Sequence, residues 1–165
     1  MAGATNARVS AWCLPALACW LLCWAGCQSS KEEDQATRVT RYQQILAVSP
    51  GDTAACYGLG TAYLERGQYG DALDAFAKVL QADSAHVGAW LGRGRVLSQK
   101  GAFDLAVAAY EKAIALKADC ADAHRGLGAV YLRTERYAEA RASYQKAIDL
   151  EPGHAPSHYN LADAG

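Results

Sequence analysis

The chain has 165 residues, the length of one ordinary domain with a hydrophobic core of its own. Apolar residues make up 52% of it and charged residues 20%, which excludes both a disordered chain and a wholly membrane-embedded one. Its 16 Lys and Arg residues and 17 Asp and Glu residues give a net charge of -1. No broad basic surface is therefore available to neutralise phosphates, and we expect no nucleic-acid partner.

The beginning of the chain has the pattern of an export signal. Arg8 precedes residues 11–26, which contain no charged residue. This apolar run is short for a membrane span, which needs about 20 apolar residues, but it suits a cleaved signal. The alternatives are an uncleaved apolar anchor and ordinary cleavage after Ala18, which would leave the apolar residues 20–22 exposed.

The end of this run resembles the lipobox of bacterial lipoproteins. Ala25 and Gly26 come directly before Cys27, although Trp24 stands where the family usually has leucine. The resemblance implies a signal peptide over residues 1–26 that is cleaved before Cys27. It also implies that Cys27 carries a diacylglycerol and a further acyl chain such as palmitate, and so anchors the protein to a membrane.

Polar residues follow the cysteine and predict a short tether over residues 27–34. An Asp after the cysteine would resemble an inner-membrane retention signal, but this chain has Gln28. The resemblance therefore favours the outer membrane over the inner membrane of a bacterial envelope.

Cysteine usage fits this interpretation. Four of the six cysteines lie in the export segment, and Cys56 and Cys120 are 64 residues apart with no CxxC pair. We expect neither a disulfide between Cys56 and Cys120 nor a zinc site.

The rest of the chain repeats with a period of 34 residues. Residues of one type recur at this spacing in several columns: Gly60, Gly94 and Gly128; Ala72, Ala106 and Ala140; and the aromatic residues Phe76, Tyr110 and Tyr144. A constant period of this length indicates stacked supersecondary units.

Each unit is predicted to form two helices joined by a tight turn. Large residues three and four positions apart predict first helices over 53–66, 87–100 and 121–134, and second helices over 69–82, 103–116 and 137–150. Gly67 and Gly101 lie in the first two turns, where glycine supplies the left-handed conformation that ends a helix. Glu135 replaces glycine in the third turn, which predicts strain or a different shape there.

Two further glycines occur inside each first helix, where each costs up to about 1 kcal/mol relative to alanine. We expect close approach of neighbouring helices, with the aromatic residues filling the gaps, to offset this cost. A nucleotide-binding loop is the alternative, but no strand precedes these glycines and no GxxxxGK[ST] sequence follows them.

On these columns the chain resembles the tetratricopeptide repeat family. Counted from the first residue of each unit, the family favours a large residue at place 4, Leu at 7, Gly or Ala at 8, aromatics at 11 and 24, Ala at 20 and 27, and Pro at 32. Place 7 departs at Arg93, and place 4 holds Cys56, Trp90, His124 and His158. The resemblance covers residues 33–163 and implies an all-α solenoid, in which Trp90 is a buried aromatic.

The repeat register also predicts the domain boundaries. Residues 35–52 align with the second helix of a repeat and place Tyr42 in the aromatic column, so they predict an amino-terminal cap. Three full repeats follow, and a partial fourth unit ends the chain; the repeats cover 53–86, 87–120 and 121–154, and the partial unit 155–165.

The first helices of this family line a concave groove that holds a partner protein. The resemblance therefore implies a groove formed by Tyr57, Thr61, Leu91, Arg95, Gln99, Arg125, Arg133 and Tyr159. Family members that grip a peptide carboxylate use Lys and Asn, and Tyr57, Thr61 and Gly92 occupy three of those places, so that clamp is absent. The arginines can pair with an acidic segment of a partner, or they are simply solvated.

No pattern of catalytic residues occurs in the chain, so we expect no enzyme, no cofactor and no small-molecule substrate. His154 and His158 are four residues apart and can bring two nitrogens to a metal, but packed or surface histidines are the preferred interpretation and we expect no metal. The sequence thus predicts a lipid-anchored adaptor of the bacterial envelope that holds a partner protein. The alternative is a structural module that oligomerises through its exposed end.

Overall fold

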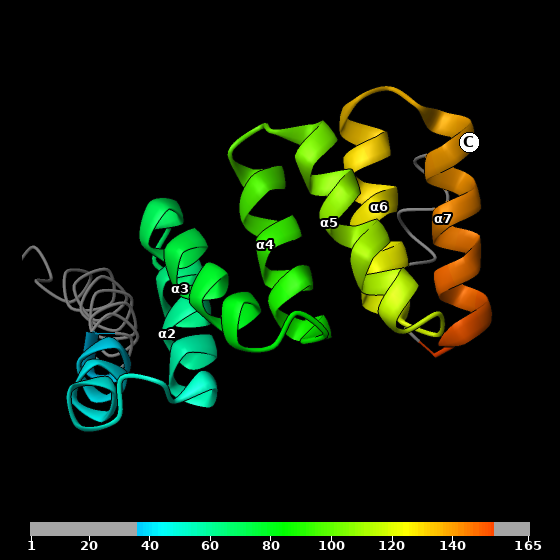
Figure 1. Cartoon of the computed structure of the whole chain (residues 1–165). Coiled ribbons are helices and arrows are strands. Elements are labelled where there is room, and N and C mark those ends of the chain that lie inside the picture. The colour runs from blue at the N-terminus through cyan, green and yellow to red at the C-terminus, as the bar shows by residue number, and fades with distance from the viewer. Residues whose placement is uncertain (1–35, 154–165) are drawn as a thin grey trace, which may run out of the picture. The chain divides into compact units, whose positions relative to one another are not determined.

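The computed structural model describes residues 36–153, which contain helices and no strand (Figure 1). A helix over residues 36–48 comes first. Six further helices follow: α2 Thr53–Glu65, α3 Tyr69–Ala82, α4 Val87–Gln99, α5 Phe103–Leu116, α6 Ala121–Arg133 and α7 Tyr137–Leu150. The predicted all-α fold is confirmed. The second helix of each pair has the predicted bounds, and the first helix ends one residue earlier than predicted.

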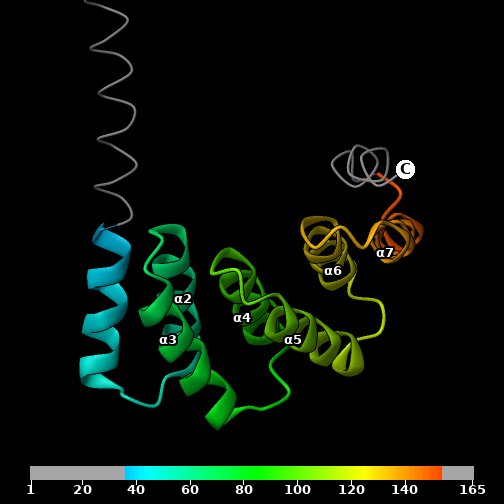
Figure 2. The same ribbon diagram turned by 90° about the horizontal axis from the view of Figure 1, so that it is seen from above.

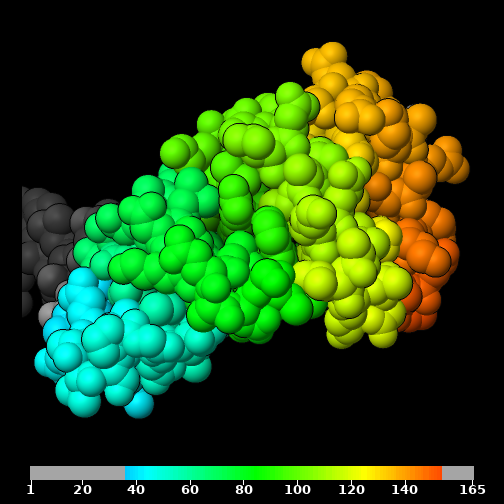
Figure 3. Space-filling view, in the orientation of Figure 1, coloured from blue at the N-terminus to red at the C-terminus, as the bar shows by residue number. Residues whose placement is uncertain are grey.

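The helices pack as three antiparallel hairpins within one compact unit that begins at Arg38. α2 packs on α3, α4 on α5 and α6 on α7, and the second helix of each hairpin also packs on the first helix of the next. The space-filling view shows successive hairpins in contact along the stack (Figure 3). Each hairpin therefore buries its apolar side chains against its neighbours, as repeat proteins do.

The first helices lie next to one another on one side of the stack. α2 contacts α4, and α4 contacts α6, whereas no comparable contact joins α3 to α5 or α5 to α7 among the described helices. Viewed from above, the first helices form one side and α3 and α5 the other (Figure 2). We call the side formed by α2, α4 and α6 the inner face.

The turns within the hairpins share one backbone conformation. Gly67 and Gly101 have φ angles of 71° and 78°, and Glu135 has a φ of 60° at the corresponding place. A left-handed conformation costs a residue with a side chain roughly 1–2 kcal/mol. The strain predicted at Glu135 is therefore present, and the period of the array is kept in spite of it.

The glycines inside the first helices make room for aromatic rings. A Cβ atom on Gly60 would lie 2.7 Å from the ring of Phe76, and one on Gly92, in the next repeat, would lie 2.4 Å from the same ring. Tyr110 lies in the same way between two glycines, and the same close approach recurs along the stack for Tyr42 with Gly58, Tyr110 with Gly94 and Gly126, and Tyr144 with Gly128. We call this set of contacts the glycine–aromatic seam. It confirms the packing explanation for the repeated glycines.

Burial in the seam is nearly complete. Phe76 and Tyr144 are 0% and 1% exposed, and burial raises the pKa of Tyr110 to about 12. Trp90, by contrast, is only half-buried instead of buried as predicted, and its Nε1–H donates to the carbonyl of Ser84 at 2.9 Å. Place 4 in the second repeat is thus close to the surface, where the ring bonds to the loop that precedes α4.

Side chains cap the starts of two first helices. Asp52 Oδ1 accepts a hydrogen bond from the backbone N–H of Ala55, and His86 Nδ1 accepts one from that of Ala89. These bonds cap α2 and α4. Cys56 and Cys120 are both buried, and both are free thiols. Of the helices that the structure describes, none has both the length and the apolar character needed to cross a membrane.

Candidate protein-interaction surface

The predicted groove residues of the amino-terminal part of the inner face mainly hold helices together. The Tyr57 ring lies 4.9 Å from the ring of His86 and 6.0 Å from that of Phe76, between centroids, so it bridges α2 and the start of α4. Thr61 donates its hydroxyl to the carbonyl of Gly58 within α2. Leu91 is half-buried against the core. These three side chains have little free surface for a partner.

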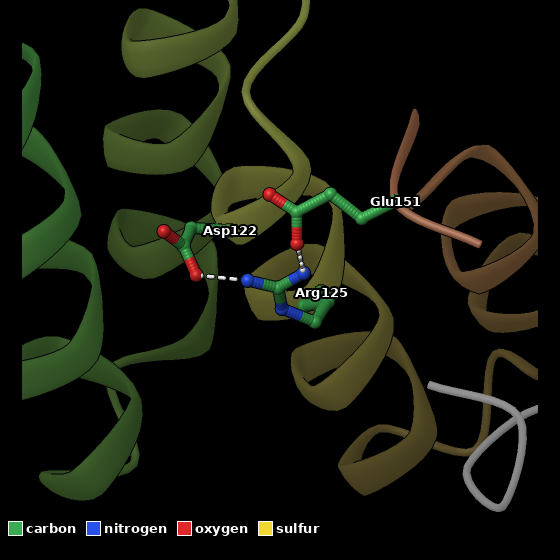
Figure 4. Close-up of polar contacts among 3 residues, drawn as sticks. All are labelled: Asp122, Arg125 and Glu151. Carbon is green, nitrogen blue, oxygen red and sulfur yellow. Dashed lines mark hydrogen bonds and ion pairs between the residues drawn. The ribbon is translucent and has the colours of Figure 1, made fainter. Parts of the chain in front are cut away.

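Arg125 is held between two carboxylates. Its guanidinium pairs with Asp122, three residues earlier on α6, and its Nη1 donates to Glu151 Oε2 at 2.7 Å, just after the end of α7 (Figure 4). The side chain is 18% exposed. Burial lowers its pKa, but the hydrogen bonds to Glu151 and Asp122 outweigh this effect and raise the pKa overall. One cation and two anions leave this cluster with a net negative charge.

Arg133 joins the second repeat to the third. Its Nη1 donates to the carbonyl of Ser98 at 2.8 Å, and its guanidinium carbon lies 5.0 Å from the centre of the Phe103 ring. The guanidinium still reaches solvent, because Arg133 is an exposed residue. No carboxylate among the described residues pairs with it.

Arg95 and Gln99 are the exposed polar residues in the second half of α4. Within residues 36–153, no side chain forms an ion pair or hydrogen bond with Arg95. Glu65, the carboxylate of the last turn of α2, is paired with Arg38 at 2.5 Å. The uncompensated positive charge of the inner face therefore lies at Arg95 and Arg133, on the two adjacent helices α4 and α6.

The remaining predicted residues lie outside the described residues, namely Cys27, His154, His158 and Tyr159. Sequence reasoning missed the carboxylate of Glu151 and the carbonyl of Ser98 as arginine partners. Glu151 follows the last helix, and no periodic signal places it beside Arg125.

The sequence was also compared with models of protein families. A model described as "Tetratricopeptide repeat" matches residues 39–87, 57–119 and 91–155, which together span more than half of the chain. The chain belongs to the tetratricopeptide repeat family. The repeats predicted from the 34-residue period are those of this family, whose fold is a scaffold for protein–protein interactions.

Solved structures agree with this assignment, whereas curated proteins show no significant match. The crystal structure of MamA is 25% identical with a TM-score of 0.72, and the match covers 83% of this chain and 80% of that one. MamA 41-end from Desulfovibrio magneticus RS-1 matches with the same identity, TM-score and coverage of this chain, and with 77% of its own length. The first TPR of Spaghetti (RPAP3), bound to the HSP90 peptide SRMEEVD, is 22% identical with a TM-score of 0.65, and the match covers 68% of this chain and 89% of that one.

Away from the inner face, the third repeat has an open groove between its two helices. A cavity of about 360 Å³ is lined by His124, Leu127 and Tyr131 on α6 and by Glu139, Ala142, Ser143 and Lys146 on α7. We call it the α6–α7 groove. The residues 68 positions earlier, Cys56, Leu59 and Tyr63 on α2 with Ala75 and Lys78 on α3, line a cavity of about 200 Å³ in the first repeat.

His124 is one of the ionisable residues that line this groove, together with Glu139 and Lys146. Burial lowers its pKa, against the opposing effect of the backbone of Ala118, and the charge of Lys146 lowers it further. Its Nε2 is buried without a hydrogen-bond partner among the described residues. The part of the chain that the structure describes contains no group of three side chains able to hold a metal ion.

Proposed function

We propose that this chain is a lipid-anchored adaptor of the bacterial envelope that holds an acidic segment of a partner protein against its inner face. The observation that supports this proposal is the pair of uncompensated arginines, Arg95 and Arg133, on neighbouring first helices. Two cations on adjacent helices can meet successive acidic side chains of an extended segment. The competing surface around Arg125 is net negative, so it would direct acidic side chains towards Arg95 and Arg133.

Binding of a defined acidic probe tests the inner face. A fluorescein-labelled, glutamate-rich decapeptide should bind the full chain in detergent solution, and its anisotropy should report the affinity. The double variant Arg95→Glu/Arg133→Glu should weaken binding at least about tenfold, which is about 1.4 kcal/mol. Binding should also weaken as salt rises, because exposed charge pairs are screened over about 8 Å at physiological ionic strength.

A matched variant controls for net charge. Lys112→Glu/Arg141→Glu changes the charge by the same amount at exposed positions of α5 and α7, and it should leave binding within about twofold of wild type. Equal losses in both double variants would show a nonspecific charge effect. If the decapeptide bound both double variants with the affinity of the wild type, the proposed site would be contradicted.

The anchor is a separate part of the proposal. Cys27 follows Ala25 and Gly26 at the end of an uncharged run, and only six residues lie between it and Asp34. Fully extended, these residues span roughly 20 Å, at about 3.3–3.6 Å each. Two or more acyl chains give stable attachment, since each buried methylene contributes about 0.8 kcal/mol. The repeats would then bind their partner close to the membrane surface.

Mass spectrometry of the purified protein beside a Cys27→Ser variant tests the anchor. The wild type should lack residues 1–26 and carry the mass of a diacylglycerol and an acyl chain. The variant should keep its signal or leave the membrane fraction. An unmodified Cys27 in membrane-bound wild type would favour an uncleaved apolar anchor instead.

Self-association through the carboxy-terminal end was the alternative function. It requires an exposed apolar face on α7, where Tyr137 is 50% exposed but Tyr144 and Ile148 are only 1% and 8% exposed. The exposed apolar surface among these three residues is thus that of one tyrosine, and we therefore rank this alternative second.

A further inference from the structure

The cavity of about 200 Å³ in the first repeat, which we call the α2–α3 groove, has an apolar wall from two helices. Leu46, near the end of the helix over residues 36–48, lines it together with Leu59 and Tyr63 on α2, and all three residues are half-buried. Gln43 Nε2 donates to the Tyr63 hydroxyl at 3.0 Å, which ties this ring to the amino-terminal helix. Such a wall can hold the methylene stem of a long side chain whose charged end remains in solvent.

Three exposed, charged residues of α3 also line this groove, namely Asp71, Asp74 and Lys78. The two carboxylates are three residues apart, so they share one face of the helix. None of the three side chains forms an ion pair or hydrogen bond with a described residue. Two carboxylates and one ammonium group give the groove a net charge of -1. The start of α3 stabilises a negative charge at Asp71, in its first turn, but Asp74 lies beyond that turn.

The α6–α7 groove has a different charge at the same places of the repeat. Glu139, at the place of Asp71, is paired with Arg136 at 2.9 Å, and Ala142 replaces the second aspartate. The unpaired charge that remains in that groove is the ammonium group of Lys146. A cationic ligand therefore has two free carboxylates to bind in the α2–α3 groove and no free carboxylate in the α6–α7 groove.

We propose that the α2–α3 groove is a second docking site, which binds an arginine side chain of a partner segment. The methylene stem lies along Leu46 and Leu59, and the guanidinium donates to Asp71 and Asp74. A guanidinium has five N–H donors in one plane, so a single side chain can bond to both carboxylates. The site contains no arginine of the inner face and binds the opposite charge, so it acts independently of the proposed acidic-segment site.

N-acetyl-L-arginine amide at millimolar concentration is the probe, followed by amide chemical shifts of the isotope-labelled full chain in detergent solution. The shifts should concentrate near Leu59, Asp71 and Asp74. N-acetyl-L-citrulline amide has a stem of the same length and no charge, so it should bind at least about fivefold more weakly. Equal binding of the two probes, or shifts scattered over the chain, would overturn the proposal.

Replacing the carboxylates tests their role directly. Asp71→Asn/Asp74→Asn changes two exposed residues and should abolish the shifts. Asp104→Asn/Glu111→Asn is the matched control, because it changes the charge by the same amount at exposed positions of α5, and it should leave the affinity for the probe unchanged. Shifts that persist in the first double variant, or an equal loss in the control, would overturn the proposal.

A variant that fills the groove tests the site by a second route. Leu59→Arg introduces a guanidinium into the groove, at the place where the second repeat has Arg93, and it should compete with the probe and abolish the shifts. The aspartate variant keeps the test available if Leu59→Arg does not fold, because both aspartates are exposed. Arg95→Glu/Arg133→Glu should bind the arginine probe as the wild type does, so failure of this site and failure of the inner face are distinguishable.

Discussion

The glycine–aromatic seam forms the same contact in every repeat, whereas the inner face has no contact that repeats. In the seam, Phe76 and Tyr110 each lie between two glycines that are 32 residues apart. On the inner face, Arg95 has no partner among the described residues, and Arg125 and Arg133 bind a carboxylate pair and a backbone carbonyl. A ring between two small residues depends only on places that recur with the period. Whether an arginine is paired depends on the carboxylates and carbonyls at the ends of neighbouring helices, and these groups do not recur with the period.

The largest expected effect comes from removing a ring from the seam. Phe76→Ala should lower the free energy of unfolding by about 3–5 kcal/mol, because the ring is 0% exposed and its loss leaves a cavity between two helices. Trp90→Ala should cost clearly less, since the indole is only half-buried. Urea denaturation followed by circular dichroism measures both values. Equal losses for the two variants would contradict the distinction between the seam and the surface of the second repeat.

Gly→Ala substitutions should have smaller effects on stability, of opposite sign at a glycine inside the seam and at one outside it. A Cβ on Gly92 would lie 2.4 Å from the enclosed ring of Phe76, and overpacking of this kind costs about 1–3 kcal/mol. Gly92→Ala should therefore destabilise the protein, although alanine is the better helix former by up to about 1 kcal/mol. Gly70 lies in α3 with no atom within 4 Å of its would-be Cβ, so Gly70→Ala should stabilise it slightly. Melting curves that show stabilisation by both substitutions would mean that the ring moves aside at little cost.

The smallest effects concern the arginines of the inner face. Arg125→Gln should cost no more than about 1 kcal/mol, because it breaks two partly exposed ion pairs, one within α6 to Asp122 and one to Glu151 just after the end of α7. Arg95→Gln should change stability by less than about 0.5 kcal/mol, the scale of a surface substitution, since no described residue pairs with Arg95. In the decapeptide assay the order should reverse, with Arg95→Gln losing more affinity than Arg125→Gln. If Arg125→Gln lost more affinity, the inner face would bind its partner at the start of α6.

The hairpins were predictable because their signals are local. The 34-residue period and the large residues spaced three and four positions apart give α3, α5 and α7 their predicted bounds, and turn glycines precede α3 and α5. The first helices were predicted one residue too long, because a helix end is set by local turn geometry that periodicity does not resolve. The strain at Glu135 was also foreseen, since the residue stands where the other turns need a left-handed glycine.

The candidate site was predictable only in part. The family register gives the positions of Arg95, Arg125 and Arg133, but it treats the three residues alike. Their different roles depend on distances across helices: Glu151 lies 26 residues after Arg125, and Ser98 lies 35 residues before Arg133. The same limit applies to Trp90, whose exposure depends on the loop that carries Ser84.

The sequence by itself therefore determined the family, the all-α hairpins and the purpose of the repeated glycines, because each rests on residues that recur at one spacing. Only the tertiary structure decided which arginine remains without a carboxylate, how deeply Trp90 lies and that His124 leaves a groove beside it. These properties arise from side-chain contacts that are made in one repeat and not in the others, so a periodic sequence pattern cannot predict them.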